Sequence, residues 1–567
     1  MPRILLLLSG LFLLLGWLLP SHFRPWATAY QELLTAVSLL LALWSLLWLQ
    51  KRPRLPAASL LVCLIACIPF VQHISGLVLY SGDAWISAAY ILAFAISTVL
   101  AFNLQRIDRN ELSFEFATGL AWVLLLGGLI SAMLAAYQWL GAGPSDWVFR
   151  LKPGARASAN IAQPNNLATL LGISLASLVY LFEQRKLPRL FAALLAGLLL
   201  CGIVLSQSRT PWLVAVFIMV FWAWQRKRLS LRLTNLHVAG WVALYVAMIL
   251  TLPVLAELLG LSVELPLDRA RQTSRLLLYS QFFQAVLQGP WYGYGWNQVF
   301  TAQASVMMEQ YYLGPTLYTH NIILDLLIWN GPVLGGVIVL GAAFWLWRLL
   351  LKANSLTATF AWLALGFVIF HSMLEFPHAY LFLLIPAGLL LGVLQASANP
   401  SETTWALPKW LLTMVALAGT AITGLFWHDY GLIEREHLAS VVEKNDKFVD
   451  KNSQAITGVY LTSQMREYTY YVRLPLKPGY SADQLDELRV AAKRYPHFYF
   501  LLKSAYIMAL NERPDEAYTY LMTIPRIYSQ QKLEQALAYL LDQSDEQSQL
   551  LPLLKLFNIH PESLPDA

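Results

Sequence analysis

Several arginines, one histidine and one glutamate lie at the ends of long apolar runs, and together they suit transfer of a group from a phosphorylated donor. His320 opens the apolar part of TLYTHNIILDLLIWNGP (316–332), and Glu375 lies within HSMLEFPHAY (371–380). Arginine side chains bind phosphate oxygens in pairs and stay charged. A histidine whose pKa is near neutrality can remove the proton of an attacking hydroxyl. These residue types therefore predict transfer from a diphosphate to a hydroxyl.

The candidate anion-binding arginines come from three segments. They are Arg156 in RLKPGARASANIAQPNNLAT, Arg209 in SQSRTPW, and Arg269, Arg271 and Arg275 in LPLDRARQTSRLLLYSQ. Arg271 and Arg275 are one helical turn apart and so share a face of a helix. Each arginine alone also has a simpler explanation, because interfacial arginines contact lipid headgroups and exposed arginines pair with nearby carboxylates.

The other titratable groups in these segments are one glutamate and three histidines. Glu375 requires a partner, because a carboxylate at a membrane boundary is costly when it is unpaired. His371 and His378 are typical of packing or hydrogen-bonding histidines, and the same explanation would serve for His320 by itself. The combination of several arginines, a central histidine and a glutamate at the ends of different spans favours a site.

The composition predicts an all-α polytopic membrane protein. The chain has 567 residues, of which 57% are hydrophobic and only 13% are charged, and its mean hydropathy is +0.53. Soluble domains carry about twice that share of charge. Apolar runs long enough to span a bilayer recur about thirteen times. They lie near 4–20, 29–49, 56–80, 84–103, 117–140, 166–182, 189–206, 211–225, 238–259, 331–351, 355–374, 380–397 and 408–427, with 320–330 as a half-helix or interfacial segment before the tenth.

Lys and Arg residues cluster in every second connection, which orients the chain. Examples are QKRPR (50–54), QRIDR (105–109), EQRKLPR (183–189) and QRKRLSLR (225–232). Cytoplasmic connections carry this excess of positive charge, so the N-terminus is expected inside. The remaining connections, including a large loop over 260–320, are expected to face the periplasm of a Gram-negative cell.

The last part of the chain, 428–567, changes in composition and is expected to form a helical periplasmic domain after a membrane domain over 1–427. The stretch LLKSAYIMALNERPDEAYTYLMTI reads as helix, turn and helix, with Pro514 at the start of the second helix. A single such hairpin is only weakly similar to a tetratricopeptide repeat.

No soluble cofactor, metal ion or nucleic acid is expected as a partner. The sequence holds no phosphate-binding P-loop, no dinucleotide-binding glycine pattern after a strand, and no HExxH zinc motif. Its three cysteines lie inside apolar runs without the spacing of metal ligands.

Four segments, in this order, resemble one known family. SQSRTPWL, QGPWYGYGWNQV, YTHNIILDLLIWNGPVLG and HSMLEFPHAYLFLLIPAGLLLG are similar to the O-antigen ligase and polymerase superfamily. ASANIAQPNNLAT and the PWYGYGW turn resemble its PglL-like branch, the protein O-oligosaccharyltransferases. The resemblance implies a GT-C-like fold in the bacterial inner membrane. It also implies transfer of a preassembled oligosaccharide from undecaprenyl diphosphate to Ser or Thr of periplasmic proteins such as type IV pilin.

The family motifs also imply roles for residues. The matched residues are His320 as the catalytic base, Arg209, Arg275 and Arg156 at the donor diphosphate, and Gln163, Tyr380 and Glu375 as substrate-positioning groups. One position departs from the pattern, because Asn166 follows the QPN stretch where many members carry histidine. A role in acceptor choice is therefore not carried over from the family to Asn166.

Three alternatives share parts of this pattern. An O-antigen ligase would use a sugar of the lipid A core as acceptor, and a polymerase would use another lipid-linked glycan. A transporter of lipid-linked glycan normally places its ionisable groups near the bilayer midplane. Here the motif charges lie at one face, which favours the transferases.

Overall fold

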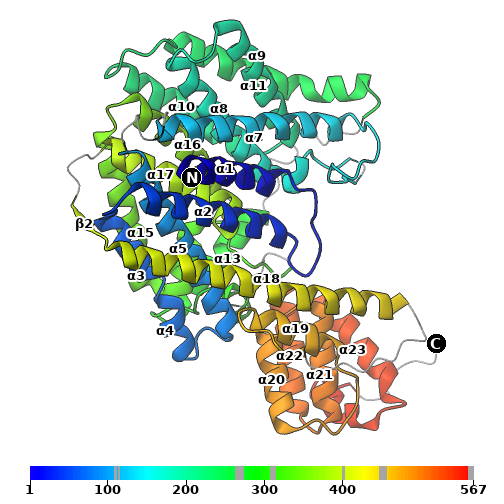
Figure 1. The fold of residues 1–567 in the computed structure, drawn as a ribbon. Helices are drawn as coiled ribbons and strands as arrows, with labels where there is room; N and C mark the ends of the chain where they lie inside the picture. The colour runs from blue at the N-terminus through cyan, green and yellow to red at the C-terminus, as the bar shows by residue number, and fades with distance from the viewer. Residues whose placement is uncertain are drawn as a thin grey trace.

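The computed structural model describes residues 1–107, 112, 115–152, 154–261, 274–306, 314–398, 403–445 and 456–559. Nearly all regular structure in these residues is α-helical, and the spans run across the view in Figure 1. The protein is a multi-pass membrane protein, because ten helical segments are long and apolar enough to cross a bilayer. Arg269 and Arg271 of the predicted loop lie outside the described residues.

A helix is present at every predicted span. The helices of the membrane part are α1 (Pro2–Leu18), α2 (Ala29–Leu49), α3 (Ala57–Ile65), α4 (Ile68–Ile74), α5 (Ser81–Leu104), α7 (Phe116–Trp139), α8 (Pro164–Glu183), α9 (Arg189–Ser206), α10 (Thr210–Arg226), α11 (Asn235–Leu258), α15 (Ile322–Lys352), α16 (Leu356–Ser372), α17 (Leu381–Ala398) and α18 (Lys409–Asn445). All of them except α3 and α4 contribute buried side chains to one apolar core.

The predicted span over 56–80 is shorter than expected and is broken into α3 and α4. Pro69 lies in the first turn of α4, where its missing N–H leaves no helical hydrogen bond unmade. Pro69 also cannot donate to the carbonyl four residues before it, that of Ile65, which explains why α3 ends there.

The predicted half-helix before the tenth span is confirmed. Within α15, Gly331 has φ 74° and ψ 169°, so a first segment ends there and a second begins at Pro332. A side chain at Gly331 would lie 2.0 Å from the carbonyl oxygen of Trp291. Glycine is therefore required both for the left-handed backbone and for the close approach of the aromatic turn.

Connections gather at two opposite ends of the bundle, as the alternation of charge predicts. At one end β1 (Arg54–Pro56) pairs antiparallel with β2 (Thr404–Ala406), seen at the left of Figure 1. At this end Glu115 accepts hydrogen bonds from Gln105 at 2.9 Å and Thr357 at 3.2 Å. The connections after α2, α5, α15 and α17 therefore meet here. The opposite end is called the site end below.

Shorter elements cover the site end. They are η1 (Ala159–Ile161), α13 (Ser274–Gln288), α14 (Val299–Ser305) and η2 (Pro377–Ala379). Helices α13 and α14 share a small apolar cluster with the first segment of α15, in which Phe282, Val299 and Ile328 are fully buried. This cluster fixes α13 against the segment that begins beside His320.

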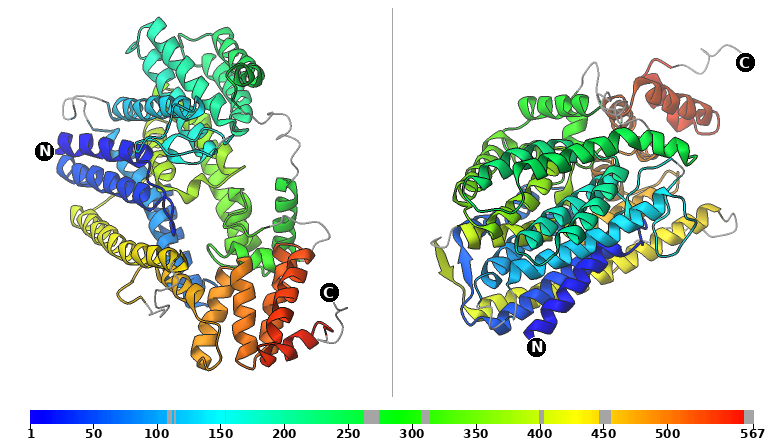
Figure 2. Two further views of the ribbon diagram at one scale, coloured as in Figure 1. Left: turned by 90° about the vertical axis from the view of Figure 1, so that its right-hand side faces the viewer. Right: turned by 90° about the horizontal axis from the view of Figure 1, so that it is seen from above.

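The C-terminal helices gather in one corner of the molecule (Figures 1 and 2). They are α19 (Ser463–Arg473), α20 (Ala482–Arg494), α21 (Phe498–Leu510), α22 (Pro514–Ile527), α23 (Gln530–Ser544), η3 (Ser548–Leu550) and α24 (Leu551–Lys555). The predicted helical hairpin is confirmed as α21 and α22, with Pro514 in the first turn of α22. These helices have an apolar core of their own.

A buried ion pair joins the C-terminal helices to the membrane part. Arg494 of α20 donates from Nε and Nη2 to the two carboxylate oxygens of Asp83 in α5, both at 2.8 Å. Both side chains are less than a tenth exposed. Asp83 holds the pKa of Arg494 above its ordinary value against the opposing effect of burial. Such a pair is costly to break, because the remaining charge is left buried.

We expect Asp83→Ala to loosen α20, because Arg494 would stay buried without its counter-ion. The opening free energy of this helix should fall by about 3–5 kcal/mol, measured by amide hydrogen exchange of the full chain. Asp486→Ala is the matched control, since Asp486 is half exposed in its 3.3 Å pair with Arg489 and should contribute under about 1 kcal/mol. Equal exchange of α20 in both variants would contradict the prediction.

Candidate active site

The carboxylate of Glu375 is the centre of the candidate site. It is 5% exposed and lies just after α16, where its N–H donates to the His371 carbonyl at 2.8 Å. One oxygen, Oε1, accepts from Asn165 at 2.7 Å and from the guanidinium of Arg275. The other oxygen, Oε2, lies 2.6 Å from Nδ1 of His320. Groups from three separate elements therefore converge on one buried carboxylate.

The charge of Glu375 is stabilised by these neighbours. Burial alone would raise the pKa of the Glu375 carboxyl, but the hydrogen bond from His320 and the charge of Arg275 outweigh it. The net result is a pKa below the ordinary value of 4.5. Glu375 is therefore ionised at neutral pH, and it can only accept hydrogen bonds in that form.

The ring of His320 is held in one tautomer by that carboxylate. Because Glu375 only accepts, Nδ1 of His320 carries a hydrogen, and in the neutral imidazole the lone pair lies on Nε2. Within the described residues Nε2 has no hydrogen-bond partner, and the side chain is 22% exposed. Phe376 packs edge-on against the ring at a centroid distance of 4.8 Å. The imidazole is thus oriented and basic at an accessible atom.

The backbone at His320 adopts a left-handed conformation, with φ 60°. Such a conformation costs about 1–3 kcal/mol for a residue with a side chain. Tyr279 compensates by donating its hydroxyl hydrogen to the His320 carbonyl at 3.0 Å. The next residue, Asn321, caps α15 by accepting from the N–H of Ile323 at 2.9 Å. Together α13 and the start of α15 fix where the imidazole points.

Arg275 joins the carboxylate to the end of α16. Its Nη2 donates to Glu375 and its Nη1 donates to the carbonyl of Leu374. The Arg275 side chain also hydrogen-bonds to Tyr279. A guanidinium has five N–H groups, so these bonds still leave donors for a further anion. The Arg275 side chain is 28% exposed, which gives such an anion access.

Arg209 is the N-cap residue of α10. Burial raises the pKa of the Tyr279 hydroxyl, and the nearby charges of Arg275 and Arg209 oppose that rise. Both guanidinium groups are therefore near enough to Tyr279 for their charges to act on its hydroxyl. The arrangement offers two cations beside one base.

Comparisons with known proteins identify the family to which the chain belongs. Family models match residues 192–340 (O-Antigen ligase), 157–182 (Protein glycosylation ligase) and 359–539 (Virulence factor membrane-bound polymerase, C-terminal). Over 566 residues the chain is 30% identical to a general O-oligosaccharyltransferase of Acinetobacter baylyi, with 96% of each chain covered. The chain belongs to the O-oligosaccharyltransferase family. It is therefore a glycosyltransferase, and the resemblance to the ligase superfamily is confirmed.

A second relative is more distant. It is a ComP-specific O-oligosaccharyltransferase of the same organism, 26% identical over 509 residues, which cover 87% of this chain and 89% of the relative. Both alignments cover most of this chain and most of the relative. The likeness is therefore not confined to the short motifs.

The structure brings three of the predicted site residues of this oligosaccharyltransferase into direct contact, namely His320, Glu375 and Arg275. Gln163 caps α8, because its side-chain oxygen accepts from the N–H of Asn166 at 2.5 Å. Tyr380 lies beside Asn166, and burial raises the pKa of its hydroxyl. The role of each of these residues toward substrate stays a prediction.

Arg156 is half-buried in the segment before η1. Its role at the donor diphosphate stays a prediction. Among the described residues no group of three His, Cys, Asp or Glu side chains could hold a metal ion.

Two residues of the site were missed by sequence reasoning. Asn165, in the first turn of α8, was quoted in its polar segment without a role, and it donates to Glu375. Tyr279 lies one turn after Arg275 on α13, and that spacing alone could have placed it on the same face. Its contact with the His320 carbonyl joins segments 41 residues apart, which no local pattern indicates.

We expect the stabilising effect of Glu375 to depend on pH. Because the folded-state pKa of Glu375 is lowered, its contribution is fully present above the unfolded value of about 4.5. It is lost as pH falls through the still lower folded-state pKa. Thermal unfolding of the purified chain and of Glu375→Gln should therefore differ most at neutral pH and converge in acid.

The matched control is Asp486→Asn, since Asp486 is half exposed. It should change the thermal midpoint little at any pH. A difference between wild type and Glu375→Gln that grows toward acid would show that the carboxylate is not stabilised as an anion.

Proposed function

We propose that this enzyme transfers a preassembled oligosaccharide from undecaprenyl diphosphate to a Ser or Thr hydroxyl of a protein, at the periplasmic face of the bacterial inner membrane. The observation that carries the proposal is the 2.6 Å contact between His320 and the buried Glu375. The orientation rests on the Lys- and Arg-rich connections at the opposite end of the bundle, since such connections favour the cytoplasm.

His320 acts as the general base in this proposal. The acceptor hydroxyl gives its proton to Nε2 of His320 while its oxygen bonds to the anomeric carbon of the donor sugar. The bond from that carbon to the diphosphate oxygen breaks, and undecaprenyl diphosphate leaves with the electron pair. Glu375 stabilises the imidazolium that forms, because the negative carboxylate lies on Nδ1.

The arginines act on the leaving group. Diphosphate is a good leaving group once its charge is held, so cations that contact it as the bond breaks lower the barrier. Arg275 keeps free N–H groups after its bonds to Glu375, Leu374 and Tyr279. The charge of Arg209 also acts on Tyr279. Arg156 is assigned to the same diphosphate by the family motif alone.

The acceptor is the part of the proposal that depends most on the relatives. One matching family is described as a protein glycosylation ligase and one relative as ComP-specific, which supports a protein acceptor such as a type IV pilin. The other two matching families are described as a ligase and a polymerase. Those enzymes would share the same base and arginines and differ in the hydroxyl that attacks.

We expect His320→Ala to abolish transfer, because no other group in the described site replaces the base. The loss should be at least about 100-fold. Intact-protein mass spectrometry of periplasmic and pilin proteins, from cells that make one defined lipid-linked glycan, measures it. A glycan-sized mass on a Ser- or Thr-containing protein is expected with wild type and not with the variant.

The matched control is His428→Ala, since the His428 side chain is 54% exposed and lies outside the site. It should glycosylate normally. Retained transfer by His320→Ala would remove the general-base assignment. Glycan on lipopolysaccharide or in longer polymers, with no protein modified by wild type, would assign the chain to the ligase or polymerase branch.

We expect Arg209→Ala to weaken binding of the donor. A charge-assisted hydrogen bond contributes about 1.5–3 kcal/mol, so the KM for donor should rise about tenfold to 100-fold. Arg209→Lys should recover part of the loss, because lysine keeps the charge but not the paired geometry. Initial rates against donor concentration measure both, with Arg185→Ala at the opposite end as control. An unchanged KM in Arg209→Ala would exclude this arginine from the diphosphate site.

A further inference from the structure

A second contact between a histidine and a carboxylate joins the two segments that carry the base and its partner. Asp325, in the first turn of α15, is fully buried, and its Oδ2 lies 3.3 Å from Nε2 of His378 in η2. The segment at the start of α15 supplies the carboxylate of this pair, and the segment after α16 supplies the histidine. In the pair of His320 with Glu375 the same two segments exchange these roles.

Asp325 holds the turn that carries the base. Its Oδ1 accepts from the N–H of Thr319 at 2.8 Å, and its own N–H donates to the carbonyl of Asn321 at 2.9 Å. Thr319 is fully buried, and its hydroxyl donates to the same Asn321 carbonyl at 2.9 Å. The residues on both sides of His320 are therefore bonded to one aspartate, and the left-handed residue lies between two fixed neighbours.

His378 completes the surroundings of Asp325. Oδ2 of Asp325 and both ring nitrogens of His378 are shielded from solvent, and within the described residues none of them hydrogen-bonds to another group. A buried carboxylate oxygen is costly without a partner, so the hydrogen on Nε2 of His378 is its counterpart. The rings of Tyr318 and Trp329 lie edge-on to the imidazole at 5.4 and 5.9 Å. Because its nitrogens are shielded, His378 acts through its neighbours and not on a substrate.

A second series of contacts leads from His378 to the ring of the base. Tyr318, which lies edge-on to His378, stacks on Phe376 at a centroid distance of 4.9 Å and an interplanar angle of 15°. Phe376 in turn packs edge-on against the imidazole of His320 at 4.8 Å. A shift of His378 would therefore reach the base through the aromatic rings as well as through Asp325.

We propose that Asp325 and His378 are positioning residues that fix the orientation of the base His320. The inference rests on the proposed function, because it takes His320 as the general base. The single hydrogen bond from the ring to Glu375 would by itself let the imidazole rotate about that bond. The second pair holds the backbone before the base and the ring beside it, so Nε2 keeps one direction toward the acceptor hydroxyl.

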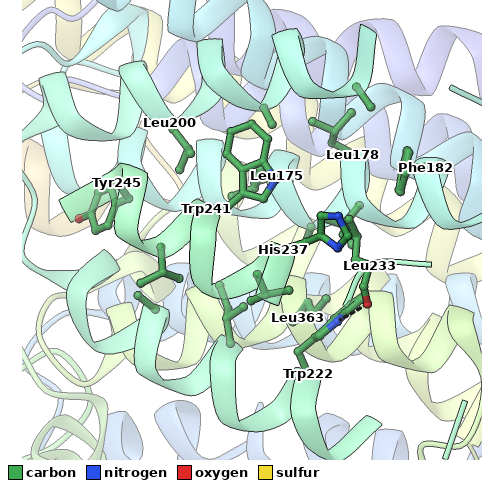
Figure 3. Close-up of a pocket in the computed structure, with 18 of the residues that line it drawn as sticks. Leu175, Leu178, Phe182, Leu200, Trp222, Leu233, His237, Trp241, Tyr245 and Leu363 are labelled. Carbon is green, nitrogen blue, oxygen red and sulfur yellow. Dashed lines mark hydrogen bonds between the residues drawn. The ribbon is translucent and has the colours of Figure 1, made fainter. Parts of the chain in front are cut away.

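The pair lies apart from the apolar cavity inside the membrane part. That cavity lies between α8, α9, α10, α11 and α16, and Tyr245, Trp241 and His237 are among the residues around it in Figure 3. Among the described residues that line it, none belongs to α15 or η2. A change in transfer caused by a substitution at position 325 or 378 is therefore not explained by an altered cavity.

The test changes the reach of the side chain at position 378. In His378→Gln the amide N–H can take the place of the N–H at Nε2, whereas in His378→Asn the amide is one carbon shorter and does not reach Asp325. We expect kcat of His378→Asn to fall about tenfold to 100-fold, because a small displacement of the base costs that much. His378→Gln should recover most of the rate. The KM for donor should stay unchanged in both variants, since the lost contact acts on the base alone.

Initial rates of the purified full chain in detergent give both constants. The donor is one defined oligosaccharide on undecaprenyl diphosphate, and the acceptor is the periplasmic protein that wild type modifies. His428→Asn is the matched control, because His428 also contacts a buried aspartate, Asp429, at 3.6 Å, and its side chain is 54% exposed outside the site. It should leave kcat and KM as in wild type.

A second pair of variants serves if His378→Asn does not fold, as judged by thermal unfolding. Asp325→Asn keeps an oxygen for the Thr319 N–H and places an amide toward His378, so it should keep most of the rate. Asp325→Ser is too short for either contact and should lower kcat as His378→Asn does.

Wild-type kcat in a folded His378→Asn or Asp325→Ser would overturn this inference. So would equal losses in His378→Asn and His378→Gln, or a higher KM with normal kcat, because neither result fits a base that has lost its orientation. Retained transfer by His320→Ala would instead contradict the proposed function. If wild type modifies lipopolysaccharide and no protein, the protein acceptor is wrong, and the same variants are measured with that acceptor.

Discussion

The buried carboxylate of Glu375 is the constraint on which the geometry of the site depends. A carboxylate removed from water costs several kcal/mol unless its oxygens are paired. Here Asn165 comes from α8, Arg275 from α13 and His320 from the turn before α15. Each of these elements must be in place for the charge to be compensated, so helix packing and the position of the base are energetically coupled.

The same coupling extends to the strained backbone at His320. A left-handed residue with a side chain persists only where its surroundings hold it. Tyr279 holds the carbonyl, Asn321 caps the helix that follows, and Glu375 holds the ring. Because α13 carries both Tyr279 and Arg275, a shift of this one helix would disturb the base and the leaving-group cation together.

Hydropathy and the distribution of Lys and Arg were sufficient to predict the helices and their two ends, because bilayer thickness and loop charge act on local sequence. The sequence also predicted the break near Gly331, as the end of a half-helix before the tenth span. The pairing of Arg275 with Glu375 was not, since the two residues are 100 positions apart. Sequence reasoning assigned Arg275 to the diphosphate and Glu375 to the substrate. Their mutual contact became visible only once α13 was packed against the end of α16.

The C-terminal helices help to hold the segment that leads to His320. Gln303 of α14 donates to the Gly314 carbonyl at 2.9 Å and accepts from the Thr316 N–H at 3.2 Å. The N–H of Gly314 donates to the carbonyl of Ile527 in α22 at 2.7 Å. The segment that leads to His320 is therefore held between α14 and the C-terminal helices. Those helices are also tied to α5 by Arg494 and Asp83. A displacement of the C-terminal helices would therefore shift Gly314, which lies six residues before the base.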